Sequence, residues 1–436
     1  MIDQTDSAER EAIQTVALPR LSWRLHVLAS PDRAWRGRIL PLPQAGVRIG
    51  RRPESVTVAI GDSTLSREHL ELLPLPDNSG VSLRDLGSHN GTRRGGQAVT
   101  HAQLGDGAVL RFGDSVAVLE CDIGACSNFS EPTADVPGRS AAARKLRSEL
   151  EAAAREGLPT LLVGATGAGK EFAARELHLR ARRMGTLTRL PQLAVTGAEI
   201  QSAVFGADRE PGLLQLARGG SLLIDGLDDL AIDCQTAILH AVDESTTPQV
   251  PSDQGILWIA TATDSLDERV RDGVLRRDLR ARFLSQRIHV PDLASRLPDL
   301  LEFADVLLPA PGGGPWTSVL LPDAVEALLL SPWPDNLWSL LATLRHLSRR
   351  YIGAQLGADA LPERFEPASG PLAEPRAQAD HAPDAEALRK LLQRYDGNIE
   401  KVATHFGRHR KQIYRWLARA GIGEPVLLDY RRGKVT

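Results

Sequence analysis

A glycine-rich stretch in the middle of the chain has the residue types and spacing needed to hold the phosphates of a nucleotide. From Gly164 to Lys170 the sequence is Gly-Ala-Thr-Gly-Ala-Gly-Lys, which fits the pattern G-x-x-x-x-G-K. In this pattern the glycines let backbone N–H groups wrap the phosphates, and the lysine reaches the β and γ phosphates. We therefore expect ATP or ADP as a ligand, with Mg²⁺ as its candidate companion. The expected nucleotide-binding residues of this loop are Gly164, Gly167, Gly169 and Lys170.

A second group of polar residues, in the first third of the chain, suits a phosphate carried by a protein. Four short signals follow in order: Gly50-Arg51, Ser66-Arg67-Glu68-His69, Asn90-Gly91-Thr92 and Leu104-Gly105-Asp106-Gly107. A phosphate dianion needs charged and hydroxyl donors that converge from several loops, and a guanidinium offers a rigid fork. Each signal alone is also typical of an ordinary hairpin loop. Their order within one β-rich stretch favours a binding site.

A third group of residues, near the end of the chain, is basic. Net charge is −3, so any contact with DNA must be encoded locally. The candidate DNA-binding residues are Arg408, His409, Arg410, Lys411, Gln412, Tyr414 and Arg415. Such groups suit base edges and phosphates.

These three groups must be positioned by different kinds of elements. Short β-type runs between turn signals predict an all-β sandwich for the first third, and they are 24–28, 56–60, 69–73, 81–83 and 108–119. A helix over 141–155 and an apolar strand over 159–164 then precede the glycine-rich loop. Buried-strand candidates at 221–225 and 256–260 complete an α/β pattern.

The basic group lies in a set of short helices. We expect an amphipathic helix over Asp384–Tyr395, a second over Ile399–Phe406 and a third over Arg410–Ala420. Gly407 would make the tight turn between the last two, as in a helix-turn-helix. The alternative is an ordinary three-helix bundle whose basic residues form a solvated face.

The bulk properties agree with several folded parts. A chain of 436 residues is too long for one core and predicts about three domains. Three cysteines without metal-site spacing, a polar start and no long apolar run predict a cytoplasmic protein that neither contacts nor spans a membrane. The expected divisions are a disordered start (1–20), the sandwich (21–124), a linker (125–139), the α/β part (140–298), a helical lid (299–356), a second linker (357–383), the helix-turn-helix (384–423) and a tail (424–436).

The four ordered signals resemble the forkhead-associated (FHA) domain, whose loops bind phosphothreonine at one end of a β-sandwich. By that resemblance Arg51 and Ser66 hold the phosphate and Arg67 assists. Asn90 holds the peptide backbone, and His69 braces the binding loop.

The middle of the chain resembles the AAA+ domain of sigma-54-dependent activators. The resemblance rests on Gly164–Glu171, Val204–Gly206, Ala217–Asp225 and Trp333–Asn336. That family hydrolyses ATP in a ring and drives a loop with the sequence GAFTGA against sigma-54 polymerase. Between Gly206 and Gly219 this chain has only residues 207–218, without that loop. The resemblance therefore implies a regulator that does not activate sigma-54 polymerase through this contact.

Other positions depart from the family in the nucleotide site itself. By this resemblance Glu171 and Asp225 also belong to the nucleotide site, and Asp225 is the candidate ligand of Mg²⁺. The family's Asp-Glu pair is Asp225-Gly226 here, so the carboxylate that orients water is replaced. The strand-end asparagine is missing near Thr263, and Trp338 stands where the family has a nucleotide-sensing arginine. By contrast, Arg276 and Arg282 keep the spacing of its two arginine fingers.

Three interpretations of this core stay open. ATP is bound but scarcely hydrolysed, no nucleotide is bound at all, or hydrolysis uses Asp228 or Asp229 as a substitute carboxylate. The first is the one we favour, so we expect a protein that is not an enzyme.

The end of the chain resembles the Fis-type DNA-binding domain of the same activators, through Gly397–Ala403 and Phe406–Leu417. Such units act as dimers on half-sites about 34 Å apart or a multiple of that. The whole sequence thus predicts a multidomain protein, with an FHA sandwich, a degenerate AAA+ core with its lid, and an all-α helix-turn-helix.

The expected function is transcription regulation on double-stranded DNA, controlled by a phosphothreonine protein, in a homodimer or higher homo-oligomer. RNA polymerase is a further candidate partner. The rival functions are an AAA+ ATPase that remodels another partner and a phosphopeptide-binding scaffold.

Overall fold

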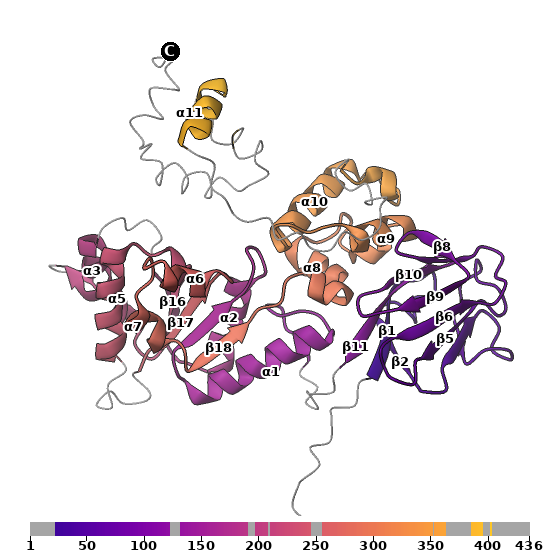
Figure 1. The fold of residues 1–436 in the computed structure, drawn as a ribbon, viewed down its shortest axis with the longest axis horizontal. Coiled ribbons are helices and arrows are strands. Elements are labelled where there is room, and N and C mark those ends of the chain that lie inside the picture. The colour runs from indigo at the N-terminus through magenta and orange to yellow at the C-terminus, as the bar shows by residue number, and fades with distance from the viewer. Residues whose placement is uncertain are drawn as a thin grey trace, which may run out of the picture. The chain divides into compact units, whose positions relative to one another are not determined.

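The computed structural model describes residues 22–122, 131–190, 197–207, 210–245, 255–351, 353–362, 385–395 and 402. The chain forms two compact units, Met1–Ala368 and Ser369–Thr436. In the first unit a β-sandwich, an α/β part and a group of helices follow one another (Figure 1).

The β-sandwich is built from two mainly antiparallel sheets. One sheet has the order β2-β1-β11-β10-β7-β8 and the other β4-β3-β5-β6-β9. Their facing side chains form a closed core that includes Leu25, Ile49, Leu83 and Phe112. The strands are β1 (Ser22–Ala29), β2 (Arg38–Leu42), β3 (Val47–Gly50), β4 (Val58–Ala59), β5 (Leu70–Pro74), β6 (Val81–Asp85), β7 (Thr92–Arg94), β8 (Gln97–Val99), β9 (His101–Leu104), β10 (Val109–Phe112) and β11 (Ser115–Asp122). The predicted sandwich is present, and the run predicted over 108–119 is a hairpin of two strands.

The α/β part has a parallel sheet with the order β13-β16-β17-β12-β18. Its strands are β12 (Thr160–Val163), β13 (Leu187–Arg189), β16 (Ser221–Ile224), β17 (Leu257–Ala262) and β18 (Gln286–His289). Its helices are α1 (Ala141–Glu156), α2 (Lys170–Arg180), α3 (Gly197–Phe205), α4 (Leu213–Leu216), η1 (Leu227–Asp229), α5 (Ile232–Ser245), α6 (Leu266–Arg271) and α7 (Arg277–Arg282). A two-stranded hairpin joins β14 (Gly206–Ala207) to β15 (Glu210–Pro211).

Alternating side chains of this sheet pack against helices on both faces. On β12, Leu161 joins the core formed with α3 and α5, whereas Leu162 joins the core formed with α1 and α2. Burial on both faces explains why the strands are continuous apolar runs. The loops that follow β12, β16 and β17 therefore meet at one edge of the sheet, where ligands of open α/β folds bind.

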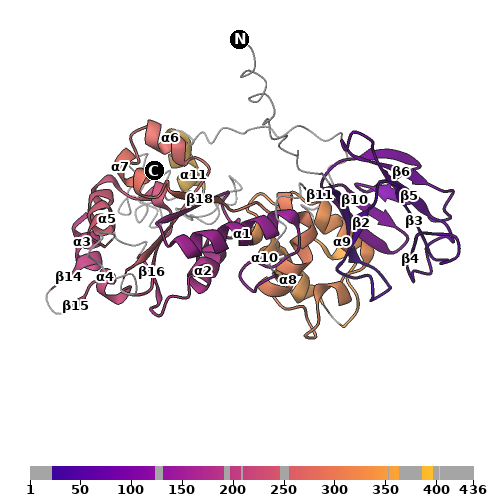
Figure 2. The ribbon, with the colours of Figure 1, turned by 90° about the horizontal axis from the view of Figure 1, so that it is seen from below.

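The helical group, which we call the lid, follows β18. It comprises η2 (Ala294–Asp299), α8 (Leu300–Leu307), η3 (Trp316–Ser318), α9 (Pro322–Leu330), α10 (Leu337–Arg350) and η4 (Ala358–Ala360). Ala360 and Leu361 are buried in its core. The linker predicted from residue 357 therefore begins too early, because these two apolar side chains still pack on the lid. Figure 2 shows the lid helices beside strands β10 and β11.

In the second unit, helix α11 (Ala385–Arg394) occupies the place of the predicted amphipathic helix over Asp384–Tyr395. Its Leu388 and Leu392 are buried, as the amphipathic pattern requires. The other two predicted helices of the helix-turn-helix lie outside the described residues except for Val402. Among the helices that are described, none is long and apolar enough to cross a membrane.

Candidate phosphate-binding sites

A cavity of about 600 Å³ lies between two loops at one end of the β-sandwich. Its lining includes the predicted residues Arg51, Ser66 and Arg67. It also includes Arg52 and Ser55, which the sequence analysis did not assign, and Glu68. The signal for Arg52 was its position directly after Arg51. The cavity brings together three guanidinium groups and two hydroxyls, which is the chemistry of a phosphate site.

Backbone contacts fix the shape of this cavity. The N–H of Arg51 donates to the carbonyl oxygen of Ser66 over 3.0 Å, so the two loops are tied together. A Cβ atom at Gly50 would lie 2.2 Å from the carbonyl oxygen of Arg67. Only glycine allows this approach, which explains the Gly50-Arg51 signal in physical terms.

His69 is fully buried and supports the same loop from beneath. Its Nδ1 accepts from the N–H of Ser66 over 3.2 Å, and its Nε2 donates to the carbonyl oxygen of Gly91 over 3.3 Å. Burial lowers the pKa of His69, because the charged imidazolium loses hydration. The neutral ring keeps Nδ1 as an acceptor, so His69 holds Ser66 in place. This arrangement agrees with the bracing role that the resemblance implies.

The third loop, with Asn90, has its own supports. The Ser66 hydroxyl accepts from the N–H of His89 over 2.9 Å, and the Asn90 amide donates to the carbonyl oxygen of Thr64 over 2.7 Å. Asp85, which the sequence analysis missed, accepts from the Thr92 hydroxyl over 2.6 Å and from the N–H of Ser88. An aspartate at a strand end followed by Ser88 is typical of an Asx turn and could have revealed this support.

The second candidate site is the loop between β12 and α2. Gly167 and Gly169 have φ of 75° and 96°, a left-handed backbone that glycine adopts without strain. The Nζ of Lys170 donates to the carbonyl oxygens of Gly164 and Ala165 over 2.7 and 2.9 Å. Burial lowers the pKa of Lys170 despite the attraction of nearby aspartates. A half-buried cation beside a glycine-rich turn fits the phosphates of a nucleotide.

The lid lies directly on this loop. The Asn336 side chain donates to the carbonyl oxygen of Thr166 over 2.9 Å, and the N–H of Leu337 donates to that of Gly167 over 3.1 Å. The guanidinium of Arg296, also buried, donates to the carbonyl oxygen of Ala168. Trp338, at the position of the family's sensing arginine, is 62% exposed and provides no cation.

The carboxylates of the site are arranged differently from an Asp-Glu pair. Gly226 has φ of 82°, and its N–H donates to the Thr261 hydroxyl over 2.9 Å. That hydroxyl donates in turn to Asp225 over 2.8 Å. Glu171 forms an ion pair with Arg189 at 2.7 Å. Within the ranges that the structure describes, no three His, Cys, Asp or Glu side chains are grouped so as to hold a metal ion.

Asp228 is the acidic residue most deeply placed here. Only 2% of it is exposed, and one carboxylate oxygen accepts from the backbone and hydroxyl of Thr263. The other oxygen, Oδ1, is buried and has no hydrogen-bond partner within the described part of the chain. Asp228 makes the largest electrostatic contribution that stabilises the charge of Lys170. Asp229, by contrast, pairs with Arg269 at 3.7 Å.

The two candidate arginine fingers lie at the surface in ion pairs within the chain. Arg276 binds both oxygens of Asp278 over 3.0 and 2.6 Å, and Arg282 binds both of Asp243 over 2.5 and 3.0 Å. The Arg276 guanidinium lowers the pKa of Asp278 to about 2. Each arginine would have to leave its carboxylate to reach a neighbouring subunit.

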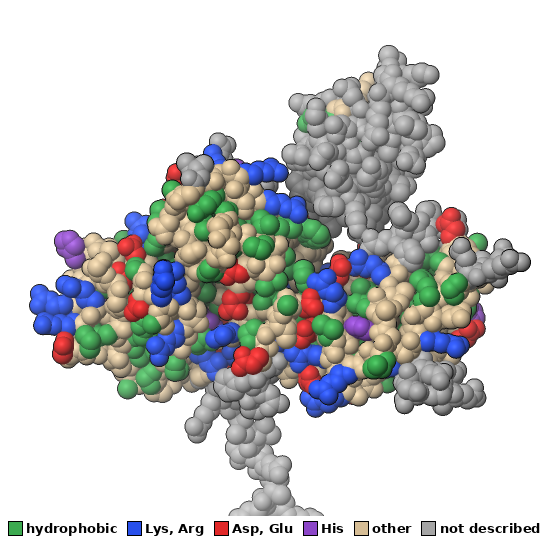
Figure 3. Space-filling view, turned by 180° about the vertical axis from the view of Figure 1, so that it is seen from behind, with side chains coloured by type: hydrophobic (Ala, Val, Ile, Leu, Met, Phe, Trp, Pro, Cys, Tyr) green, Lys and Arg blue, Asp and Glu red, His purple; other side chains and the backbone are tan. Residues whose placement is uncertain are grey.

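The predicted DNA-binding residues, from Arg408 to Arg415, lie outside the described residues. On the face of the described residues in Figure 3, Lys and Arg side chains lie among Asp and Glu. This mixture agrees with a net charge of −3.

Two family models match the parts of the chain in which these sites lie. The model of the FHA domain matches residues 47–113, and that of the Sigma-54 interaction domain matches residues 136–289. The nitrogen assimilation regulatory protein NtrX of Azorhizobium caulinodans is 27% identical over 66% of this chain and 69% of its own length. The DNA-binding transcriptional regulator NtrC of Escherichia coli is 28% identical over 54% of each chain.

A crystal structure of NtrX from Brucella abortus in complex with ATP is 26% identical, with a TM-score of 0.45, over 68% of this chain and 71% of that one. In the curated relatives that this chain matches, such as the two above, the matched part covers between 45% and 69% of the relative's own length.

Proposed function

We propose that this chain, which combines an FHA domain with a Sigma-54 interaction domain, is a DNA-binding transcriptional regulator controlled by phosphothreonine recognition. The observation that carries the proposal is the cavity of three arginines and two serines on the sandwich. Its partner is a protein that carries phosphothreonine, and its output is a change in the occupancy of double-stranded DNA.

The charge of the cavity suits this ligand. Phosphothreonine carries a charge of about −1.5 to −2 at pH 7. The guanidinium groups of Arg51, Arg52 and Arg67 complement that charge, whereas Glu68, which also lines the cavity, would repel an acidic residue of the peptide beside it. Charge-assisted hydrogen bonds from arginine to phosphate are stronger than neutral ones and fix orientation.

The α/β part acts in this proposal as a nucleotide-bound coupling element. ATP or ADP binds the loop from Gly164 to Lys170, where the glycines fit the phosphates and Lys170 supplies charge. Mg²⁺, when bound, would be held by Asp225 and would offset phosphate charge. Hydrolysis is slow, because Gly226 carries no side chain that could orient water.

DNA binding is assigned to the helix-turn-helix predicted over 384–423, which acts in a homodimer or higher homo-oligomer. Residues 207–218 do not contain the sequence GAFTGA. The regulator therefore acts without that contact to sigma-54 polymerase.

The proposal is tested by phosphothreonine binding. Arg51→Ala, in the cavity, should abolish capture of fluorescent phosphothreonine peptides from a degenerate library at moderate salt. Arg48→Ala is the matched control, because Arg48 lies on β3, three residues before Arg51, and pairs with Glu71 instead of lining the cavity. Equal capture by both variants, or equal capture of unphosphorylated peptides, would count against an FHA-controlled regulator.

A second candidate function, an ATPase that remodels another partner, is favoured by Asp228. Its buried, unpaired Oδ1 lies near Lys170, where a carboxylate could accept a proton from water. If so, steady release of inorganic phosphate should fall by about 10² or more in Asp228→Asn and in Lys170→Ala. Asp233→Asn, a change of an exposed acid on α5, is the control. Absence of release in the unchanged protein removes this candidate.

The third candidate, a phosphopeptide scaffold, predicts that Arg410→Ala and Lys411→Ala leave DNA retention unchanged. The regulator instead predicts weaker retention with a smaller salt dependence, because phosphate contacts are lost.

A further inference from the structure

We propose that the FHA domain holds the lid on the glycine-rich loop Gly164–Lys170, which we call the phosphate loop. As such a brace, it prevents the lid from opening unless contacts to the FHA domain are broken. This inference concerns the described residues of the first unit and does not rest on the proposed function.

The outer face of the FHA sheet is apolar where it meets the lid. On β11, Ala117 and Leu119 point into the core of the sandwich, whereas Val116 and Val118 belong to the core of the lid. On β10, Val109 also belongs to the core of the lid. An antiparallel sheet with a solvated outer face would carry polar residues at these positions. One continuous core therefore joins the sandwich to helices α8, α9 and α10.

An ion pair between a half-buried arginine and a buried glutamate lies at the margin of this core. Arg111 on β10 lies 3.5 Å from Glu326 on α9, and the Glu326 side chain is 7% exposed. Helix α9 lies beside β10 in both ribbon views (Figures 1 and 2). Removing one charge of a buried pair leaves the other without compensation, which is strongly unfavourable.

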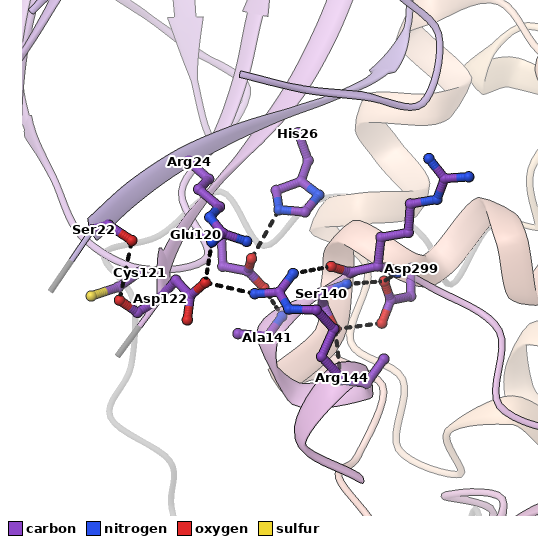
Figure 4. Close-up of polar contacts among 12 residues, drawn as sticks. Ser22, Arg24, His26, Glu120, Cys121, Asp122, Ser140, Ala141, Arg144 and Asp299 are labelled. Carbon is purple, nitrogen blue, oxygen red and sulfur yellow. Dashed lines mark hydrogen bonds and ion pairs between the residues drawn. The ribbon is translucent and has the colours of Figure 1, made fainter. Parts of the chain in front are cut away.

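The start of helix α1 binds the FHA domain and the lid at once. The N–H of Ala141 donates to Glu120 of β11 over 2.6 Å, and Arg144 pairs with Asp122 at 2.7 Å. From the lid, the carboxylate of Asp299 accepts from the N–H and the hydroxyl of Ser140 over 2.9 and 2.5 Å. Figure 4 shows these carboxylates converging on the helix start. Negative groups are stabilised there by the helix dipole, so both domains are held to the same point.

The lid is hydrogen-bonded to the phosphate loop. Asn336, Leu337 and Arg296 each donate to a backbone carbonyl between Thr166 and Ala168. On the FHA domain, the loop with Asn90 leads into β7. Strand β7 pairs with β10, so that Arg93 of β7 lies opposite Arg111 of β10. The loop with Asn90 and the phosphate loop are therefore connected through one set of packed elements.

The test is amide hydrogen exchange of the full chain without any added ligand. Arg111→Glu places a carboxylate beside Glu326 and Asp114. Exchange should become about tenfold faster, or more, in peptides covering 164–170 and 333–338, since a broken buried ion pair promotes local opening. The charge swap Arg111→Glu with Glu326→Arg should restore exchange to within about twofold of the unchanged chain.

Two controls keep the test decisive. Arg48→Glu breaks an exposed ion pair elsewhere on the same domain and should leave both peptides unchanged. If Arg111→Glu does not fold, Val118→Ala replaces it, with Val81→Ala as the control that weakens only the sandwich core. The brace is disproved if Arg111→Glu or Val118→Ala loosens α9 but exchange over 333–338 matches that of its control.

Discussion

His69 shows how one buried side chain can control a binding loop. Its neutral ring accepts from Ser66 and donates to Gly91, so it joins two of the loops around the phosphate cavity. Protonation of Nδ1 would replace an acceptor by a second donor and set it against the N–H of Ser66. The loop should therefore depend on pH in a way that follows from the shifted pKa of His69.

We predict that the stability conferred by neutral His69 is fully present above pH about 6.5, the ordinary histidine value, and is lost as the pH falls below it. The sign follows because the unfolded chain binds the proton more readily than the folded one. Denaturation of the unchanged chain and of His69→Asn should be compared between pH 7.5 and 5.5. In His69→Asn, the free energy of unfolding should lose the part of its pH dependence that His69 contributes. That part is a slope of at most about 1.4 kcal/mol per pH unit. Equal slopes in both proteins would contradict this role.

Among the elements, the turn after β16 differs most from what its resemblance implies. At φ of 82°, Gly226 adopts a backbone that a residue with a side chain adopts only with strain. The loss of the family's glutamate is therefore accompanied by a change in local backbone, and Asp228 rather than residue 226 brings a carboxylate near Lys170.

Substitution at this turn should reveal the strain. Gly226→Ala should lower the free energy of unfolding by about 1–2 kcal/mol, and Gly226→Asn by less, because asparagine tolerates the left-handed region. Gly105→Ala is the control, since Gly105 has no positive φ and open space around it. Urea denaturation measures all three. A Gly226→Ala protein as stable as the control would mean that the turn can relax.

Several of the helices and strands could be predicted from the sequence. The strands before Gly164 and Asp225 were predicted because buried parallel strands are continuous apolar runs. Strands β7, β8 and β9 were not, because each is only three or four residues long with exposed positions. Pocket residues were predicted where a motif named them, whereas Arg52 and Asp85 depend on loop shape.

At the scale of the whole first unit, the sandwich and the lid share one hydrophobic core. The valines of β10 and β11 and the lid residues Leu328 and Leu344 are all buried in it. Sequence patterns could not predict this, because a valine that faces another domain cannot be distinguished from one that faces its own core.

A fragment that begins at residue 131, and so lacks the sandwich, should therefore expose the lid face. Each fully buried Val or Leu contributes roughly 1.5–3 kcal/mol when removed from water. We expect the fragment to bind a hydrophobic dye and to aggregate, as measured by fluorescence and light scattering. Adding a separate fragment of residues 1–122 should reduce both signals. A monomeric fragment with no more dye binding than the full chain would show that the shared core is dispensable.

In the proposed regulator, the phosphothreonine cavity controls the occupancy of DNA. Genome-wide mapping of bound DNA, with the unchanged chain and Arg51→Ala at equal abundance, tests it most directly. We predict discrete bound sites outside sigma-54 promoters, with occupancy that changes several-fold, roughly 1 kcal/mol or more, in Arg51→Ala. Identical occupancy of the two proteins, or no site above the background of an Arg410→Ala and Lys411→Ala variant, would contradict the claim.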